Sequence, residues 1–242
     1  MVAQFETIQP AFYSRSALDV APDLLGTLLC RRTGGRLRVA RIVETEAYLP
    51  DDPASHAYRG PTPRNRVMFG PPGHAYVYLI YGMHHCLNTV TEPEGTGGAV
   101  LIRAAEPLFG CEEMWRARFP GSEVPAGLTD AVDARLLARI ASGPGRLCSA
   151  LGIHRDRENG ARLYSGDLII ARHAVIAADG TDDRATVVVE APRELDIVED
   201  GRIGIRRAAD RPWRFTIAGS PFVSRKPDPA IRPRRHRPHH LQ

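Results

Sequence analysis

Lysine is almost absent from this chain of 242 residues, since Lys226 is the only one. The other strongly basic residues are arginines, whose planar guanidinium groups suit bidentate contacts with phosphates and bases. A biased genome would produce the same excess of arginine, so composition alone indicates a partner only weakly. The length is sufficient for a substantial core, and one domain is as compatible with it as two.

Cysteine is scarce, and long apolar runs are missing. The four cysteines form no C-x-x-C pair, so the sequence indicates neither a zinc ribbon nor a redox motif. His84, His85 and Cys86 would point in different directions on a strand, and no second ligand pair follows at metal spacing. We therefore predict no metal and no cofactor. No apolar run approaches the ~20 residues that span a bilayer, and no leader-like segment opens the chain, which predicts a soluble, cytoplasmic protein.

Acidic residues are missing from the whole segment between Pro53 and Thr91. Five of the seven tyrosines lie between residues 41 and 103: Tyr48, Tyr58, Tyr76, Tyr78 and Tyr81. The acid-free segment also contains three arginines and four histidines, namely Arg59, Arg64, Arg66, His56, His74, His84 and His85. Aromatic and basic groups without acids indicate a surface that faces something flat and anionic. For Tyr76 alone, an ordinary core strand is the preferred interpretation.

The net charge of +4 is unevenly distributed. Residues 225–242 contain six basic residues and one acidic residue and so carry +5, which leaves −1 for residues 1–224. Four prolines in the same segment disfavour a packed structure. We therefore predict a globular domain over residues 1–224, followed by a disordered basic tail that acts as a loose polycation on a phosphate backbone.

Hydrophobic periodicity predicts both helices and strands. Ser16 is a candidate N-cap for a helix over residues 16–29, kinked or restarted at Pro22. Further helices are predicted at Leu108–Phe119, at Asp130–Ile140 and in Ser142–Leu151. Strands are predicted at Leu37–Val43, Ala75–Ile80, Ala99–Ala105, Asp167–Ala171, Ala185–Glu190 and Trp213–Ile217. Because helices and strands do not alternate regularly, we predict an α+β fold with a mixed, largely antiparallel sheet.

Two glycine-rich segments indicate different things. The loop Glu94–Gly98 leads into a strand instead of opening a helix, which argues against a dinucleotide-binding fingerprint. The segment that begins Ser142-Gly-Pro-Gly-Arg146 has the form of a helix start, with Pro144 near the first turn. Its free N–H groups and Arg146 could hold a phosphate, and a purely structural cap fits equally well.

Two carboxylates and a phenol share one face of Val43–Tyr48 if that segment is extended, since side chains alternate along a strand. They belong to Glu44, Glu46 and Tyr48. Arg103 interrupts the otherwise apolar strand Ala99–Ala105 and would need a carboxylate partner if buried. Such a pair can be purely structural, and it can also hold a water molecule between a base and an orienting cation.

An ordered set of motifs extends over most of residues 10–224: Val43–Tyr48, His56, Thr62–Arg66, Met68–Phe69, Tyr76–Met83, Asn88, Leu101–Pro107, Ser142–Pro144 and Gly219–Pro221. Together these motifs resemble the alkyladenine (3-methyladenine) DNA glycosylase family, and the combination is far more specific than any single motif. The resemblance implies a single mixed domain that flips a damaged purine out of duplex DNA and hydrolyses its N-glycosidic bond with water. It also implies a cytoplasmic, bacterial-type protein that is associated with the nucleoid through DNA. The protein is expected to be a monomer and to need no obligatory protein partner.

The resemblance also assigns roles to residues at matching positions. Glu46 resembles the general base, and Arg103 resembles the residue that helps to position the water. The residues that resemble the base-binding set are Tyr48, His56, Tyr78, Asn88 and Ile205. Within this set the two tyrosines and the histidine would sandwich the flipped base, Asn88 would crowd the amino group of normal guanine, and the backbone near Ile205 would complete the contacts of the water.

DNA contacts are expected from a protruding hairpin and from arginines. Tyr81 resembles the wedge that is left in the duplex, and Gly82 permits a turn that projects it outward. The residues expected to contact DNA are Tyr81, Met83, Arg64, Arg66 and Arg146.

Two other functions share some of these features. A nucleobase deaminase also flips its base, but the H-x-E…P-C-x-x-C zinc pattern is absent from the sequence. A non-enzymatic minor-groove protein that binds damaged DNA would use the wedge and the arginines but not Glu46 and Arg103, and it remains the alternative. Because a lyase step needs an amine and Lys226 is far in sequence from the aromatic segment, we expect a monofunctional enzyme. The preferred lesion is left open, among 3-methyladenine, 7-methylguanine, hypoxanthine and ethenoadenine.

Overall fold

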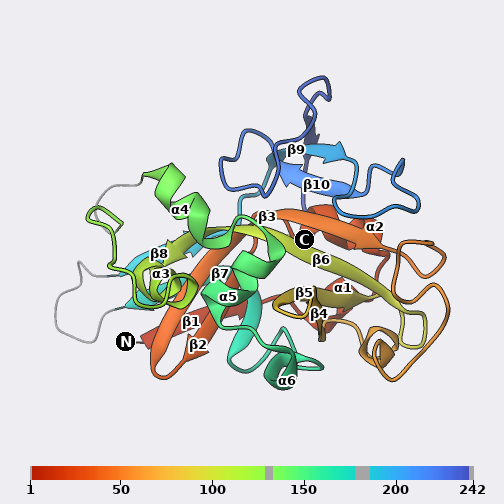
Figure 1. Cartoon of the computed structure of the whole chain (residues 1–242), viewed down its shortest axis with the longest axis horizontal. Coiled ribbons are helices and arrows are strands. Elements are labelled where there is room, and N and C mark those ends of the chain that lie inside the picture. Colours follow the sequence, from red (N-terminus) through yellow and green to blue (C-terminus); the bar gives the residue numbers. More distant parts are fainter. Residues whose placement is uncertain (1, 129–132, 178–185, 240–242) are drawn as a thin grey trace.

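A computed structural model describes residues 2–128, 133–177 and 186–239. Eleven strands in these residues form one antiparallel sheet, surrounded by short helices (Figure 1). The strands are β1 Val2–Thr7, β2 Leu28–Thr33, β3 Arg36–Tyr48, β4 Ala75–Ile80, β5 His84–Thr91, β6 Gly98–Phe109, β7 Leu168–Ala177, β8 Val187–Glu190, β9 Leu195–Asp200, β10 Arg214–Ile217 and β11 Arg234–His236. The helices are α1 Pro10–Tyr13, α2 Ala17–Asp23, the 3₁₀ turn η1 Arg66–Phe69, α3 Cys111–Arg118, α4 Ala134–Ala141, α5 Pro144–Leu151 and α6 Arg155–Glu158. The predicted α+β fold with a largely antiparallel sheet is confirmed.

The long strands β3 and β6 form the centre of the sheet. β6 pairs with β3 from Val39 to Tyr48, while the other edge of β3 pairs first with β2 and then, at residues 44–46, with β10. Residues 44–46 of β3 are therefore flanked by strands on both sides. Side chains that point out of such a strand are covered by helices or loops, and this is where Glu44 and Glu46 are buried.

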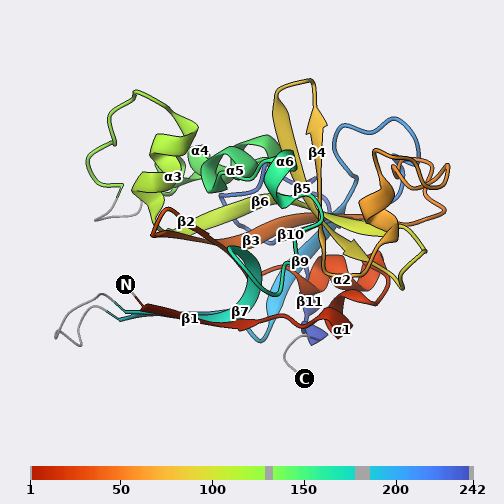
Figure 2. The same cartoon turned by 90° about the horizontal axis from the view of Figure 1, so that it is seen from below.

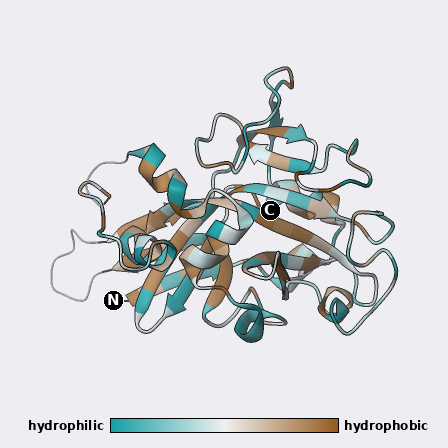
Figure 3. Cartoon of the chain, viewed as in Figure 1, coloured by the Kyte–Doolittle hydropathy of each residue, from teal (hydrophilic) through white to brown (hydrophobic). Residues whose placement is uncertain are grey.

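The helices cover the two sides of this centre. Seen from below, α3, α4 and α5 lie on one side of β3 and β6, and α2 lies on the other (Figure 2). The brown apolar stretches in Figure 3 follow the central strands and the helix faces toward them, and the buried apolar side chains form one main core. The β4–β5 hairpin stands out from the body of the molecule on the side of α5 (Figure 2). The predicted protruding hairpin is thus present.

Most predicted elements are found, with boundaries shifted by a few residues. The helix predicted over residues 16–29 is wrong in its second half, because α2 ends at Asp23 and Leu28 already belongs to β2. The Ser16 hydroxyl does cap this helix by accepting a hydrogen bond from the Leu18 N–H at 3.3 Å. Continuous apolar runs fit a buried strand as well as a helix, which explains the error. The starts of the predictions at residues 130 and 185 lie outside the described residues.

The prediction of a disordered tail is wrong for the part of the tail that the structure describes. β11 adds to the outer edge of β9, with Arg234 opposite Ile197 and His236 opposite Leu195. The positive charges find acidic partners there: Arg234 pairs with Glu199, while Arg235 and Arg237 pair with Glu194 at 2.7 and 3.7 Å. Local pairing removes the basis for a loose polycation, and β11 lies on the side of the molecule opposite the β4–β5 hairpin (Figure 2).

A buried contact also holds the tail. His236 Nε2 lies 2.8 Å from Oδ1 of Asp23, a carboxylate that is only 1% exposed and that also accepts a hydrogen bond from Arg15. Burial would raise the pKa of Asp23, but the hydrogen bonds from His236 and Arg15 outweigh it and lower that pKa. The tail therefore completes a polar cluster beside α2. No helix in the described residues has the length and apolar character needed to cross a membrane.

Deleting residues 229–242 should destabilise the fold, because it removes β11 and with it two groups that hydrogen-bond to Asp23, the His236 side chain and the His239 backbone. Exposed ion pairs contribute little, so we expect a loss of about 1–3 kcal/mol, or roughly 2–10 °C in melting temperature, measured by calorimetry. His236→Ala should account for most of the loss, and Arg235→Ala for little of it. An unchanged melting temperature after the deletion would show that β11 does not form in solution.

Candidate active site

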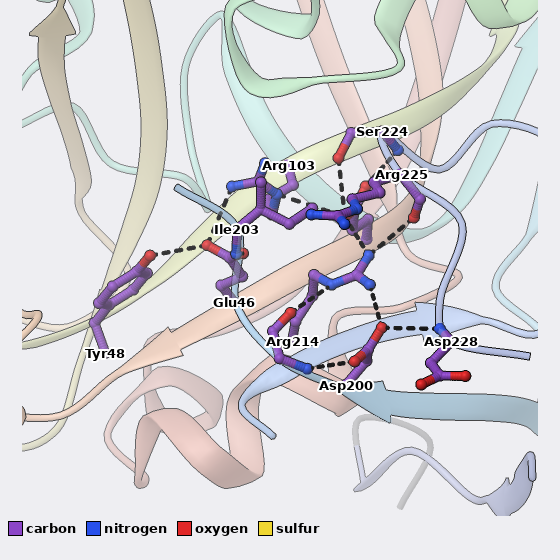
Figure 4. Close-up of polar contacts among 11 residues, drawn as sticks. Glu46, Tyr48, Arg103, Asp200, Ile203, Arg214, Ser224, Arg225 and Asp228 are labelled. Carbon is purple, nitrogen blue, oxygen red and sulfur yellow. Dashed lines mark hydrogen bonds and ion pairs between the residues drawn. The ribbon is translucent and has the colours of Figure 1, made fainter. Parts of the chain in front are cut away.

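The centre of the site is the carboxylate of Glu46, near the C-terminal end of β3. The extended conformation of Val43–Tyr48 places Glu44, Glu46 and Tyr48 on one face, as the alternation predicts. Both glutamates are 0% exposed. Glu46 Oε1 accepts a hydrogen bond from the backbone N–H of Ile203 at 2.7 Å, and Oε2 accepts one from the Tyr48 hydroxyl at 2.8 Å (Figure 4).

Arg103 of β6 forms ion pairs with both glutamates. Its Nη1 donates to Glu46 Oε2 at 3.1 Å, and its Nε lies 3.5 Å from Glu44 Oε1. Burial would lower the pKa of Arg103, but the two carboxylates outweigh it and raise that pKa, so the guanidinium stays charged. The charge predicted within an apolar strand is therefore buried and paired, as the sequence required.

The pKa of Glu46 is raised above its usual range. Burial is the main cause, since it penalises the charged carboxylate, and the nearby charge of Glu44 acts in the same direction. Arg103, the Ile203 N–H and the Tyr48 hydroxyl oppose the rise without cancelling it. A carboxylate with a raised pKa is a stronger base than an ordinary glutamate, which suits proton abstraction.

The segment 201–205 closes over Glu46 and is itself held by a buried arginine. Arg202 forms an ion pair with Asp52 through Nη1, and Nη2 donates to the same carboxylate at 3.1 Å. The Arg202 guanidinium also lies over the rings of Tyr48 and Trp213, at 4.6 and 5.0 Å from their centroids. The Arg202 side chain therefore holds both the backbone of the 201–205 segment and the rings of Tyr48 and Trp213 in place.

An aromatic cavity of about 670 Å³ opens in front of this carboxylate. It is lined by most of the residues that the sequence singled out: Tyr48, His56, Arg64, Tyr78, Tyr81, Asn88, Arg103 and Ile205. The centroids of the His56 and Tyr78 rings lie 4.6 Å apart, and Tyr48 belongs to the same lining. Glu46 lies behind the wall, where Tyr48, Arg103 and Ile203 separate it from the cavity. A flat ring can enter such a space between aromatic walls.

Two polar side chains of the cavity are fixed by the same tyrosine. The Tyr76 hydroxyl lies 2.9 Å from His56 Nδ1, and the Tyr76 carbonyl accepts a hydrogen bond from the Asn88 side chain at 3.0 Å. Burial and the nearby Arg64 lower the pKa of His56, which favours the neutral ring. Burial raises the pKa of Tyr76 to about 12. Tyr76 is a core residue, as preferred from the sequence, but it also orients the cavity.

The tip of the β4–β5 hairpin presents exposed apolar side chains. Tyr81 is 83% exposed and Met83 is 69% exposed. Tyr81 has a φ of 53° and Gly82 a φ of 71°, so the turn forces a bulky residue into the left-handed region. Backbone strain combined with an exposed ring is typical of functional positions. Met83, Arg66 and Arg146 are exposed and lie outside the cavity lining.

Sequence reasoning missed several residues. Ile205 lines the cavity, but the backbone contact to Glu46 comes from Ile203. Arg202, Asp52 and Arg214 were not singled out, because their partners are more than a hundred residues away or in irregular loops. For Arg214 the sequence does contain a signal of a buried ion pair, because this charged residue lies within the predicted strand Trp213–Ile217.

The raised pKa of Glu46 has a consequence for stability. Because the folded-state pKa lies above that of the unfolded chain, the contribution of this group is present at low pH and is lost as the pH rises through the folded pKa. Glu46→Gln should therefore be at least as stable as the wild type at neutral pH, and its advantage should shrink toward about pH 4. Urea unfolding across this range measures the effect.

Glu158→Gln is the matched control for this substitution. Glu158 is also buried, and it accepts hydrogen bonds from Arg31 at 2.7 Å and from the His154 N–H at 2.6 Å. Glu158→Gln leaves Arg31 buried without this counter-charge and should destabilise the fold, whereas Arg103 keeps Glu44 beside it when Glu46 is replaced. Equal losses for the two variants would contradict the assignment of a strained, functional carboxylate.

Comparison with known proteins identifies relatives over nearly the whole chain. The profile of the family Methylpurine-DNA glycosylase (MPG) matches residues 11–221. A provisionally named 3-methyladenine DNA glycosylase of Anaeromyxobacter dehalogenans (strain 2CP-1 / ATCC BAA-258) is 46% identical over 218 residues, which are 90% of this chain and 85% of that protein. A protein of the same provisional name from Methanoculleus marisnigri is 47% identical over 227 residues, 91% of this chain and 100% of the relative.

The matched region contains the buried Glu46–Arg103 pair, the aromatic cavity and the hairpin, so the similarity and the geometry concern the same part of the molecule. The chain belongs to the methylpurine-DNA glycosylase family.

Proposed function

We propose that this protein removes alkylated and deaminated purines from duplex DNA by flipping the base into the aromatic cavity and hydrolysing its N-glycosidic bond with a water activated by Glu46. The observation that supports this most directly is the buried Glu46 carboxylate, which is held from three directions behind the wall of a cavity large enough for a purine. The range of substrates includes 3-methyladenine, 7-methylguanine, hypoxanthine and ethenoadenine.

The geometry provides for the hydrolytic step. Glu46 Oε1 accepts one hydrogen bond from protein, which leaves a lone pair for a water admitted between Tyr48, Arg103 and Ile203. Within the described part of the chain, Nη2 of Arg103 has no protein partner and can donate to the same water. Glu46 takes a proton as the water oxygen bonds to the anomeric carbon, and the electrons of the broken carbon–nitrogen bond leave with the base.

The cavity accounts for the binding of a flipped base. Tyr48 on one side and His56 with Tyr78 on the other form the stacking surfaces, and flipping costs a few kcal/mol that stacking offsets. Cationic lesions such as 3-methyladenine leave easily because they depart as neutral molecules. Asn88 faces the cavity with its amide fixed to Tyr76, a position from which it excludes the amino group of guanine.

DNA would be engaged by the hairpin and by the arginines near it. The exposed ring of Tyr81 fills the space that a flipped nucleotide vacates, with Met83 beside it. Arg64, Arg66 and Arg146 are exposed on the acid-free loops and on the first turn of α5, where they can contact phosphates. The protein would act on DNA as a monomer.

The protein belongs to a family of monofunctional glycosylases, and its site agrees with this chemistry. Schiff-base formation needs an amine; the only lysine, Lys226, is exposed and does not line the cavity. A non-enzymatic damage-binding protein would not need a buried base beside its cavity, because burying Glu46 and Arg103 costs free energy without strengthening contact to DNA.

Glu46→Gln tests the mechanism. It should retain lesion binding and lower single-turnover excision of hypoxanthine from a duplex by roughly 10²–10⁴, the usual contribution of a positioned general base. Glu158→Gln should excise at the wild-type rate under the same conditions. Excision by Glu46→Gln within a few-fold of wild type would refute the proposed role of Glu46.

Tyr81→Ala tests the wedge. The ring acts only after a base has left the stack, so affinity for lesion and abasic duplexes should fall by about tenfold, while affinity for undamaged duplex changes little. Tyr58→Ala, which removes another exposed tyrosine outside the cavity lining, is the control. Equal losses on damaged and undamaged DNA would mark Tyr81 as a general contact.

A further inference from the structure

A second layer of buried charge lies directly behind the Glu46–Arg103 pair (Figure 4). Its centre is Arg214 of β10, which is 1% exposed and stands opposite Glu46 in the register of β3 and β10. Its partners are the carboxylates of Glu44 and Asp200. None of these three groups lines the cavity, so none touches a bound base.

Arg214 directs four of its five N–H groups at four acceptors. Nε donates to the carbonyl of Gly201 at 3.0 Å, and Nη2 donates to Asp200 Oδ2 at 2.6 Å. Nη1 donates to Glu44 Oε1 and to the carbonyl of Arg225, both at 3.0 Å. A guanidinium can span acceptors in this fixed fork, whereas a lysine ammonium cannot.

One path leads from Arg214 through Glu44 to Arg103. Glu44 Oε1 is shared between Nη1 of Arg214 and, at 3.5 Å, Nε of Arg103. Ser224 fixes the same carboxylate from the other side, with its N–H at 2.6 Å from Oε2 and its hydroxyl at 3.0 Å from Oε1. Glu44 therefore has no freedom to turn, and the guanidinium of Arg103 is held between two fixed carboxylates.

A second path leads from Arg214 to the segment over Glu46. The Gly201 carbonyl accepts from Arg214, and the Gly201 N–H donates to Asp200 Oδ1 at 2.6 Å. Two residues further on, the Ile203 N–H donates to Glu46 Oε1. Arg214 thus controls both the cation and the backbone donor that hold Glu46.

This arrangement is costly if stability is its only purpose. Each buried charge has to be taken out of water, and well-packed apolar side chains in place of a buried ion cluster are often as stable or more so. Buried charged groups can instead orient a neighbouring reactive side chain through their hydrogen bonds. In metal sites, the residues that hydrogen-bond to the metal ligands orient those ligands in the same way.

We propose that Glu44 and Arg214 are positioning residues for hydrolysis: they hold Arg103 and the 201–205 segment where Glu46 and a water can react. The inference depends on the proposed roles of Glu46 and Arg103. Its experiment must therefore separate failure of the positioning from failure of the mechanism.

Glu44→Gln is the first variant, because it keeps the shape of the side chain and removes its charge. Single-turnover excision should fall about 10- to 100-fold, the range found for outer-shell partners, with little change in affinity for lesion DNA. Glu158→Gln is the matched control, a buried glutamate bound to one arginine and one backbone N–H away from the cavity. It should keep the wild-type rate.

The pH profile supplies a readout that a loss of stability would not move. The groups that face Glu46 are Glu44 and Tyr48 of β3, Arg103 of β6, Tyr78 of β4, Cys86 of β5 and the Ile203 N–H. Glu44 raises the pKa of Glu46 by like-charge repulsion, so Glu44→Gln should move the acidic limb of the excision rate to lower pH. Glu158→Gln should leave that limb in place.

A double-mutant cycle decides between positioning and an independent effect. In the Glu46→Gln background, Glu44→Gln should cost no further rate, because the base that it positions is gone. Independent, multiplying losses would overturn the inference. If Glu46→Gln loses activity and Glu44→Gln does not, the positioning role of Glu44 is overturned and the mechanism stays intact. If Glu46→Gln keeps full activity, the mechanism itself is refuted.

Arg214→Lys covers the case in which Glu44→Gln does not fold, as judged by circular dichroism. The lysine keeps the charge that compensates Glu44 and Asp200, but its single nitrogen cannot reach all four acceptors. The same fall in rate is expected, again without further loss in the Glu46→Gln background. A wild-type rate in Arg214→Lys would contradict the proposal.

Discussion

The ion pair between Glu46 and Arg103 is the interaction on which the rest of the site depends. The two side chains come from neighbouring central strands, β3 and β6, and both are buried. Water can reach a charge in such a place only by a defined route, and the low polarity around it strengthens each remaining hydrogen bond. The fold thereby raises the pKa of a common glutamate and fixes its orientation, the two properties that the proposed hydrolysis of a glycosidic bond requires.

The cost of this arrangement explains why distant segments meet at one place. A buried carboxylate needs donors on both oxygens, and β3 itself supplies only the Tyr48 hydroxyl. The other donors come from β6, from the 201–205 segment and, for Glu44, from Ser224 near the C-terminal end. Sequence separations of about 160 to 180 residues are bridged because an unsatisfied charge would be worse than an ordered loop.

Local patterns predicted the parts of the site that depend on local geometry. Alternation along β3 placed Glu44, Glu46 and Tyr48 on one face, and the charge inside an apolar strand identified Arg103 as a buried partner. The roles in base recognition came from the resemblance to a family. The contact of Ile203, the fork of Arg214 and the pairing of β11 with β9 could not be predicted, because each depends on partners that only the folded chain brings together. The tail shows this most clearly, since its composition indicates disorder and its acidic partners lie on β9.

The surroundings of Glu46 and the tip of the β4–β5 hairpin differ in how firmly their side chains are held. Glu46 and its partners are fixed by several hydrogen bonds each, whereas Tyr81 projects from a strained turn into solvent. Chemistry on a flipped base needs both properties: atoms at the reacting bond must not move, while the probe that enters the duplex must be free of contacts that it would have to break. The β4–β5 hairpin joins the two, because Tyr78 in the cavity wall and Tyr81 at the tip are three residues apart on one ribbon. In the proposed mechanism, this short ribbon therefore joins the ring that enters the DNA directly to the wall on which the flipped base stacks.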